Sequence, residues 1–167
     1  MQEAFRSKIP GFDEIAERIT TMVAGAKLLN LPIIVTEQYP KGLGHTAEEI
    51  KAALPSGVEI IEKTTFSSCG TRQFQNQLES AGAKQVLVGG IEAHICVNQT
   101  VHDLLSAGFQ VHLLADCIGA RQPINKKISM RKMQSSGAIL SSIEMALFEL
   151  LRDAKHEQFK AIQQLIK

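Results

Sequence analysis

Residues 83–100 read AKQVLVGGIEAHICVNQT, and this stretch decides the fold of the chain. Residues 85–88 form a short apolar, β-branched run between turn signals, which predicts a buried strand. The two glycines that follow allow backbone angles closed to other residues, so the chain can leave the strand sharply. From Ala93 onward the spacing of apolar residues becomes helical, which predicts a helix that ends near Gly108.

Cys96 lies in the first turn of that predicted helix. The free backbone amides and the positive end of the helix dipole both favour an anion there. A thiol in such a place has a lowered pKa and is a stronger nucleophile. We therefore expect Cys96 to attack a substrate carbonyl. The alternative is an inert cysteine that packs as a small hydrophobe, and the local pattern favours the nucleophile.

The rest of the chain alternates predicted strands with predicted helices. Strands are expected over residues 33–36, 58–61, 109–114 and 138–140, and helices over 13–29, 46–54, 71–81, 124–135, 143–151 and 157–166. This alternation predicts one α/β domain over residues 1–167: a doubly wound, mostly parallel sheet with helices on both faces, a Rossmann-like three-layer fold. Ligands of such folds bind at the carboxyl ends of the strands.

Four loops that follow predicted strands should therefore converge on one crevice. They carry Gln38 and Tyr39, then Lys63 and Phe66, then Glu92 and Cys96, then Asp116. Lys63 is the best cationic partner for a Cys96 thiolate, although its position fits a solvated loop lysine equally well. The backbone amides of Cys96 and of a residue in the turn over 90–92 would stabilise a tetrahedral oxyanion. For Asp116 we favour a structural role, as a cap of the loop that follows its strand.

Composition excludes several classes of function. The formal net charge is +1 with basic residues spread among acids, which gives no electrostatic footprint for nucleic acid or an acidic membrane. No apolar run is long enough to span a bilayer, and the first residues have no apolar core of a secretory signal. Three cysteines without paired spacing favour a reducing compartment, so we expect a cytoplasmic protein.

Four segments carry a resemblance to a known family. They read VLVGGIEAHICVNQTVHDLLSAGFQVHLLAD, TEQYPKGLG, EKTTFSS and RKMQSSGAILSSIEMALFELL, and together they cover most of the chain. This combination resembles the isochorismatase-like cysteine hydrolases, and within them the isochorismatase domain-containing branch. The resemblance implies the parallel three-layer fold already expected from the alternation.

The resemblance also implies a Cys–Lys–Asp triad. Cys96 matches its nucleophile and Lys63 its lysine, while the Ile91–Glu92 bond matches a non-proline cis peptide of the family. The backbone amides of Glu92 and Cys96 would then form the oxyanion hole. We assign substrate contacts to four further residues: Ile91, Gln38, Tyr39 and Phe66.

The triad aspartate has no match in this sequence. In the family it follows a central first strand, immediately before a pair that resembles Met1 and Gln2 here. The strand and its aspartate would thus precede residue 1, and we expect such a segment in the natural protein. Without that strand, the sheet would keep two unpaired edges. Asp13 is no substitute, because its pattern places it in the first turn of a helix.

Two other positions depart from related proteins. Ala93 and His94 stand where the family often has Thr and Asp. This difference leaves the polarity of the substrate open. We expect His94 to lie at the surface or in a subunit contact. Nicotinamidase-type relatives hold a metal after their second strand, where this chain has only His45 nearby. One histidine does not make a metal site, so we predict neither metal nor cofactor.

Three functions remain open at this point. The first is a cysteine-dependent hydrolase of a small amide, or of a related carbon–nitrogen or vinyl-ether substrate, that passes through a thioester-like intermediate. The second is a catalytically weak or inactive member that serves as an oligomeric interaction module. The third is a redox-responsive thiol protein. The expected partners are a small-molecule substrate and further copies of the chain, with the closing helices as candidate interfaces.

Overall fold

The computed structural model describes residues 1–167. Its strands are β1 (Val35–Gln38), β2 (Ile60–Lys63), β3 (Gln85–Ile91), β4 (Gln110–Gly119) and β5 (Ile139–Ser141). Its α-helices are α1 (Phe12–Leu28), α2 (Pro40–Leu43), α3 (Glu48–Ala53), α4 (Arg72–Ala81), α5 (Asn98–Ser106), α6 (Pro123–Ser135), α7 (Ile143–Leu151) and α8 (Phe159–Leu165). Shorter turns of helix are η1 (Glu3–Phe5), η2 (Ser68–Gly70) and η3 (Ala93–Val97). The predicted α/β alternation is confirmed.

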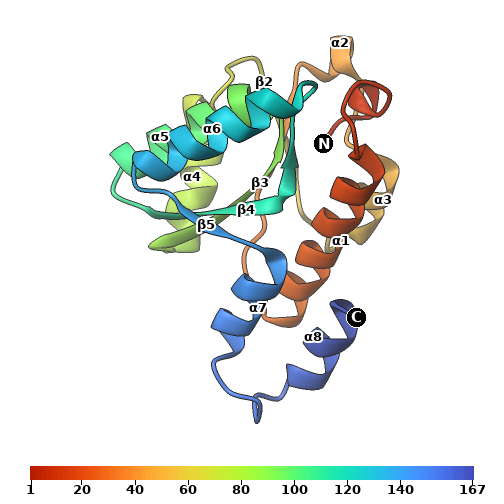
Figure 1. Ribbon diagram of the computed structural model, residues 1–167, viewed down its shortest axis with the longest axis vertical. Coiled ribbons are helices and arrows are strands. Elements are labelled where there is room, and N and C mark those ends of the chain that lie inside the picture. The colour runs from red at the N-terminus through yellow and green to blue at the C-terminus, as the bar shows by residue number, and fades with distance from the viewer.

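The strands form two parallel sheets, ordered β1-β2 and β3-β4-β5. In the first, Val35 is in register with Ile60, and Gln38 with Lys63. Helices α5 and α6 pack on one face of β4, and α1 packs on the other face, so the strands lie between two helical layers (Figure 1). Layers on both faces keep a parallel sheet out of water.

Helix α1 follows the predicted apolar stripe. Its buried residues include Ile15, Ala16, Val23 and Ala26, spaced so that they share one face. The acids of its first turn complement the positive end of the helix dipole. The helix therefore covers the sheets with one side, while its other side stays in water.

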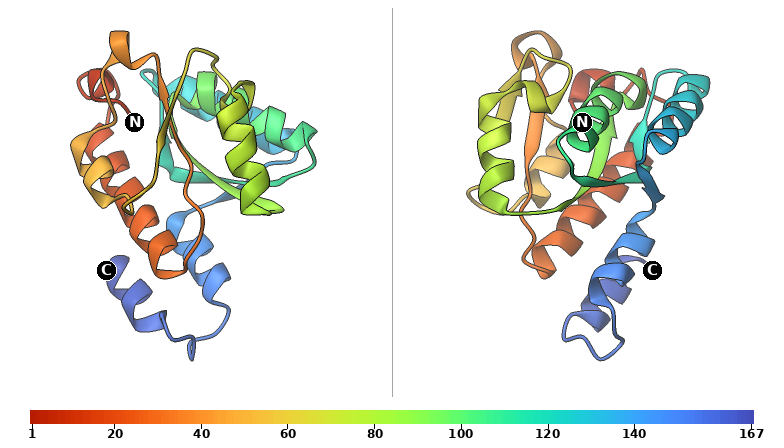
Figure 2. Two further views of the ribbon diagram at one scale, coloured as in Figure 1. Left: turned by 180° about the vertical axis from the view of Figure 1, so that it is seen from behind. Right: turned by 90° about the vertical axis from the view of Figure 1, so that its left-hand side faces the viewer.

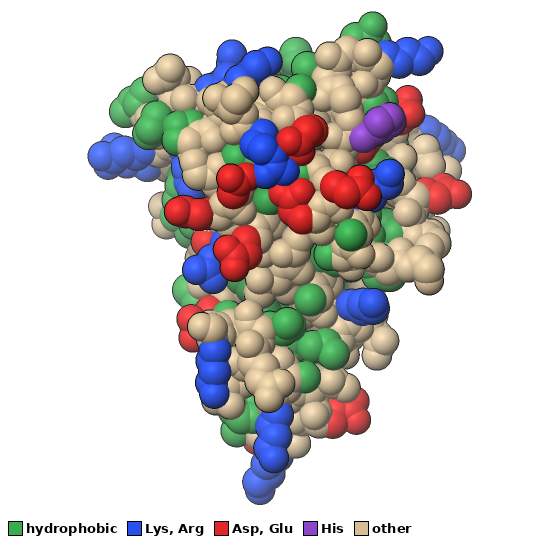
Figure 3. Space-filling view, turned by 90° about the vertical axis from the view of Figure 1, so that its right-hand side faces the viewer, with side chains coloured by type: hydrophobic (Ala, Val, Ile, Leu, Met, Phe, Trp, Pro, Cys, Tyr) green, Lys and Arg blue, Asp and Glu red, His purple; other side chains and the backbone are tan.

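Three apolar clusters make up the core. The largest lies under α5 and α6, the second joins α7 and α8 to the sheet, and the third holds the amino-terminal segment on α1 and α3. Above the third cluster, the guanidinium of Arg6 forms ion pairs with Glu3, Asp13 and Glu49. Figure 3 shows basic and acidic side chains gathered on this face.

The strand ends differ from their predicted positions. Strands β1 and β2 begin two residues later than expected and end on Gln38 and Lys63. The prediction placed these two polar residues in loops, but they are the last residues of the strands and lie at the edge of the sheet. Strand β4 continues to Gly119, past its predicted end at Leu114, because its last part pairs with the end of β3.

Candidate functional site

Three predicted site residues meet at the carboxyl edge of the strands. Gln38 and Lys63 are the last residues of β1 and β2, and Cys96 lies in η3, directly after β3. Parallel strands place their carboxyl ends at the same edge, which explains how residues so far apart in sequence meet. Lys63 is buried, with 6% of its surface exposed, so it is not a solvated loop lysine.

The amide of Gln38 sits between the cation and the thiol. Lys63 Nζ donates to Gln38 Oε1 at 2.7 Å and to the carbonyl oxygens of Thr65 and Phe66 at 2.9 and 2.8 Å. Cys96 Sγ lies 4.0 Å from the same Gln38 Oε1. Gln38 Nε2 donates to Thr64 O at 2.7 Å, which fixes the orientation of the amide. The ammonium and the thiol therefore share one neutral acceptor.

Burial is the main cause of the pKa shifts of Cys96 and Lys63. It raises the pKa of the Cys96 thiol, and the opposing influences of Lys63 and of the backbone N–H groups of Glu92 and Cys96 only partly offset it. Burial likewise lowers the pKa of Lys63, with the nearby sulfur acting in the opposite direction. Both shifts disfavour the charged forms. The expectation of a lowered thiol pKa is therefore wrong, because removal of the sulfur from water outweighs the attraction of Lys63 and of the backbone N–H groups.

The Glu92 carboxylate pairs with Arg121, and its negative charge acts with burial to raise the pKa of the Cys96 thiol. One carboxylate oxygen accepts from Arg121 Nε at 2.9 Å and from Arg121 N at 3.3 Å, and Glu92 is only 6% exposed. The peptide bond between Ile91 and Glu92 is cis, as the resemblance implies. Sequence reasoning missed Arg121 as a partner of Glu92, and only the loop position of Arg121 after β4 hinted at it.

A cavity of about 1250 Å³ adjoins these groups. Its lining includes most of the predicted site residues: Cys96, Lys63, Gln38, Phe66, Ile91 and Glu92. Tyr39 is not among them. Its exposed ring lies over Gly42, where an added Cβ would be 2.5 Å from the ring. The structure therefore brings Phe66 and Ile91 to the cavity, and leaves Tyr39 at its rim or beyond.

Other polar candidates have structural roles. The carboxylate of Asp116 accepts from Ile143 N at 3.1 Å and so caps α7. Its role is structural, but Asp116 lies within β4 and caps α7 rather than the loop that follows its strand. His45 Nδ1 lies 3.0 Å from the buried carboxylate of Glu37. No group of three or more His, Cys, Asp or Glu side chains is arranged to hold a metal ion.

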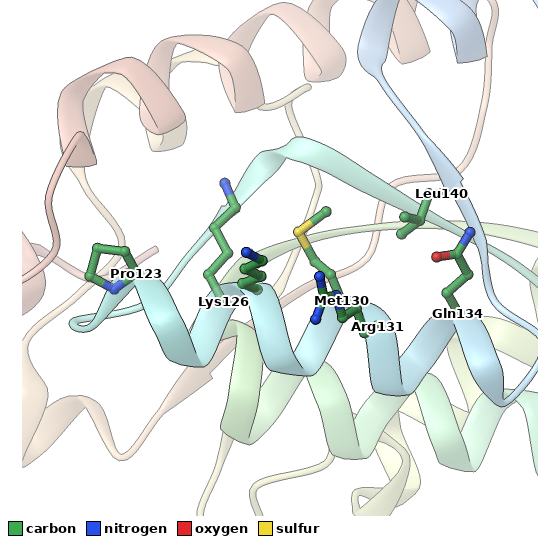
Figure 4. A pocket seen from close by; sticks show the side chains of 7 residues that line it. Pro123, Lys126, Met130, Arg131, Gln134 and Leu140 are labelled. Carbon is green, nitrogen blue, oxygen red and sulfur yellow. The ribbon is translucent and has the colours of Figure 1, made fainter.

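A second, smaller cavity of about 350 Å³ lies along α6 and faces β5. It is lined by Pro123, Lys126, Lys127, Met130, Arg131, Gln134 and Leu140 (Figure 4). No predicted site residue belongs to it. None of the helices combines the length and the apolar character that a membrane span requires.

Comparisons with known proteins agree with this architecture. The model of the isochorismatase domain matches residues 1–145. Isochorismatase domain-containing protein 2 of Danio rerio is 39% identical over 167 residues, which cover 99% of this chain and 83% of that protein. The human protein of the same name is 40% identical over 168 residues, covering 100% of this chain and 80% of its own length.

Solved structures of similar proteins superpose closely. The MAR1 ribonuclease from Caenorhabditis elegans has a TM-score of 0.95 and 39% identity, over 99% of this chain and 84% of that one. YcaC from Pseudomonas aeruginosa, described with hexane-2,5-diol and covalent acrylamide, has a TM-score of 0.90 and 25% identity. The match covers 98% of this chain and 84% of that one. YcaC from Escherichia coli, described as an octameric hydrolase of unknown specificity, has the same fold, with a TM-score of 0.91 and 23% identity. The match covers 99% of this chain and 82% of that one. With the domain match and the sequence identity over the full chain, these likenesses show that the chain belongs to the family of isochorismatase-like hydrolases.

Proposed function

We propose that this chain is a cysteine-dependent hydrolase of a small amide or a related carbon–nitrogen substrate. The observation that carries the proposal is the meeting of Cys96, Lys63 and Gln38 in the lining of one cavity. Cys96 Sγ is the nucleophile. The backbone N–H groups of Glu92 and Cys96, which lower the pKa of the thiol, would bind the oxyanion that forms beside the sulfur.

The reaction would proceed in two steps. The sulfur adds to the substrate carbonyl, the carbon–nitrogen bond breaks, and the amine leaves with the proton of the thiol. Water then adds to the thioester, and the carbon–sulfur bond breaks to release the acid and restore the thiol. The ammonium of Lys63 stabilises the thiolate and the negative charge that develops during attack.

The transfer of the thiol proton needs an acceptor. The Gln38 amide is a poor base, and the carboxylate of Glu92 is engaged by Arg121. Lys63 forms no ion pair with any carboxylate of the chain. The triad aspartate implied by the family resemblance would fill this role, and without a carboxylate at this position we expect slow turnover.

Acrylamide is a suitable first probe, because it forms a covalent adduct in the structure described for the Pseudomonas aeruginosa neighbour. We would incubate the protein with acrylamide and, separately, with a panel of primary amides, then locate adducts by peptide mass mapping. Cys96→Ser should abolish the adduct, and the matched variant Cys69→Ser should retain it. Equal modification of Cys69 and Cys96, with no amide hydrolysed, would overturn the proposal.

A second candidate function is an oligomeric interaction module. Large apolar side chains are exposed on α6 and α7: Ile124, Ile128, Met145, Phe148 and Leu150. Exposed apolar surface of this kind marks protein contacts. Sedimentation velocity would show an assembly larger than one chain that Ile128→Lys dissociates, while Lys127→Ala on the same helix does not. A module without enzymatic activity would assemble normally yet hydrolyse none of the amides.

The name of the Caenorhabditis elegans neighbour adds a further substrate to the assay. That protein is described as a ribonuclease. A labelled RNA included in the panel, with Cys96→Ser as the control, separates the two substrate classes. Cleavage of RNA that survives Cys96→Ser would place any such activity outside the proposed site.

A further inference from the structure

The loop after β4 contacts the turn that carries Cys96. Strands β3 and β4 pair in parallel as far as their carboxyl ends, where Ile91 is in register with Gly119. Glu92 follows β3 and Arg121 follows β4, so both residues leave the sheet at the same edge. Both views of Figure 2 show the green helix of η3 and α5 beside the cyan helix α6, into which the loop of Arg121 leads. A side chain of this loop can therefore reach the chain next to the sulfur.

The main chain of Glu92 links β3 to the nucleophile. Its carbonyl oxygen accepts from Ile95 N at 3.1 Å and from Val97 N at 3.3 Å, and these two bonds begin the turn η3. Its backbone N–H is one of the groups that lower the pKa of the Cys96 thiol, and the proposed function assigns this N–H to the oxyanion. A rotation of Glu92 would therefore move the oxyanion donor and the start of the turn together.

Arg121 supplies every hydrogen bond that the Glu92 carboxylate accepts. The carboxylate Oε2 accepts from Arg121 Nε at 2.9 Å and from Arg121 N at 3.3 Å. The side chain of Glu92 is 6% exposed, whereas that of Arg121 is 53% exposed. Without the guanidinium, the buried carboxylate would keep one backbone N–H and no counter-charge, which is a costly state for a charged group.

The charge of Glu92 acts on the sulfur as well. Lys63 lowers the pKa of the Cys96 thiol and Glu92 raises it, while the amide of Gln38 between Lys63 and the sulfur is neutral. Arg121 is the counter-charge of Glu92. Because opposite charges in contact weaken the field of each, the guanidinium reduces the repulsion between this carboxylate and a thiolate.

Other charged or titratable groups on the neighbouring elements lie elsewhere. His94 is two residues from the nucleophile, so it lies on another face of the turn. Lys126 of α6 acts on the thiol of Cys117, and Asp103 of α5 acts on that of Cys69. The local charge balance at the nucleophile therefore depends on the lysine after β2 and on the ion pair after β3 and β4.

We propose that Arg121 is a positioning residue of the Cys96 site. It holds the Glu92 carboxylate, and through Glu92 it holds the turn that carries the sulfur and the oxyanion donor. Its positive charge also shields a forming thiolate from that carboxylate. Arg121 does not line the cavity, so it acts through Glu92 rather than on the substrate. This inference rests on the proposed role of Cys96 as the nucleophile.

The first test measures the Cys96 thiol and needs no substrate. Labelling by iodoacetamide is followed against pH, with peptide mass mapping to count Cys96 apart from the other cysteines. Arg121→Ala should raise the midpoint, because the charge of Glu92 then opposes the thiolate without a counter-charge. Arg121→Lys should restore part of the shift, since it restores the positive charge. Arg131→Ala, at an exposed position on α6, is the matched control and should leave the midpoint in place.

A double-mutant cycle tests whether Arg121 acts through Glu92. Glu92→Gln keeps the shape of the side chain without its charge, so it should lower the midpoint of Cys96 labelling. In the Glu92→Gln background, Arg121→Ala should shift the midpoint far less than in the unaltered protein, because the group that it shields is already neutral. An arginine that only stabilises the loop would lower the thermal midpoint in both backgrounds and leave Cys96 labelling unchanged. Arg121→Gln replaces Arg121→Ala if circular dichroism shows that the latter is not folded.

The second test follows turnover of any amide that the protein hydrolyses. Arg121→Ala should lower kcat by about tenfold or more with little change in KM, because the oxyanion donor is displaced while the residues that line the cavity remain. The inference fails if Arg121→Ala labels with the midpoint of the unaltered protein, if it shifts the midpoint equally in both backgrounds, or if KM rises while kcat holds. Absence of hydrolysis by the unaltered protein would count against the proposed function alone, because the labelling experiments decide the role of Arg121 without a substrate.

Discussion

At the level of single residues, Lys63 and Cys96 were predictable as a pair because both follow predicted strands, and parallel strands end at one edge. Their protonation was not predictable. The pKa of the thiol depends on how much water reaches the sulfur, and that depends on elements that lie far from residue 96 in the sequence. The central place of Gln38 was equally hidden, because sequence position alone does not show which atoms its amide reaches.

Removal of the Lys63 charge should raise the pKa of the Cys96 thiol further. Lys63→Ala takes away the attraction that partly offsets burial, so the thiolate becomes harder to form. We expect the midpoint of iodoacetamide labelling against pH to rise, so that labelling at a fixed pH below the midpoint becomes slower than in the unaltered protein. Lys41→Ala, a substitution of an exposed lysine outside the site, should leave the midpoint in place. An unchanged midpoint in Lys63→Ala would show that the ammonium does not act on the sulfur.

Cys117 should make the folded state less stable at alkaline pH. Burial raises the pKa of its thiol to about 12, against an ordinary value of 9.0. Between these values the folded protein keeps a proton that the unfolded chain releases, so the free energy of unfolding falls as pH rises, by up to about 1.4 kcal/mol per unit. Urea titrations at pH 8 and pH 10 would measure this fall in the free energy of unfolding. The fall from pH 8 to pH 10 should be smaller in Cys117→Ala than in the unaltered protein.

The contribution of the other thiols can be separated in the same experiment. Cys69 is half-buried, and burial raises its pKa as well, but Cys117 is only 1% exposed. The loss of unfolding free energy between pH 8 and pH 10 should therefore be affected less by Cys69→Ala than by Cys117→Ala. Identical losses in Cys117→Ala and in the unaltered protein would mean that the Cys117 thiol titrates as it does in the unfolded chain.

At the level of elements, periodicity located most of the helices, and the apolar runs located each strand to within a few residues. The errors fall where a polar residue belongs to a strand, as Gln38 and Lys63 do, or where pairing extends a strand, as in β4. Propensity cannot reveal either, because the neighbouring strand supplies the hydrogen bonds. The short helix α2 was not among the predicted helices, since proline and glycine make up half of its sequence, PKGL.

The cap of α7 gives a prediction at this level. Both carboxylate oxygens of Asp116 lie within hydrogen-bonding distance of Ile143 N, at 3.2 and 3.1 Å, where α7 has a free amide. Asp116→Ala should lower the free energy of unfolding by about 1 kcal/mol, as loss of a helix cap does. A fall in thermal midpoint would report it. Asp103→Ala, at an exposed position on α5, is the matched control, and equal midpoints for the two variants would contradict the capping role.

At the level of the whole molecule, the split sheet governs which parts open first. β1 pairs only with β2, whereas β4 pairs with β3 on one side and β5 on the other. A two-stranded sheet is only marginally stable by itself, and local opening is easiest where few hydrogen bonds cross. The family resemblance pointed to two unpaired edges, but their separation and the cavity between them became evident only in three dimensions.

Native-state hydrogen exchange should therefore divide the molecule into two parts. We expect the β1 amides of Val35 and Glu37, which face β2, to exchange faster than the β4 amides of Leu113 and Leu114, because the first pair of strands can open without disturbing the second sheet. Exchange measured by NMR in rising low concentrations of denaturant would give an opening free energy for each amide. Ala52→Phe should preserve the difference, since Ala52 lies outside the cavity. Equal opening free energies for β1 and β4 would show that the helical layers join the two sheets into one cooperative unit. The separation of the sheets would then have no effect on local opening.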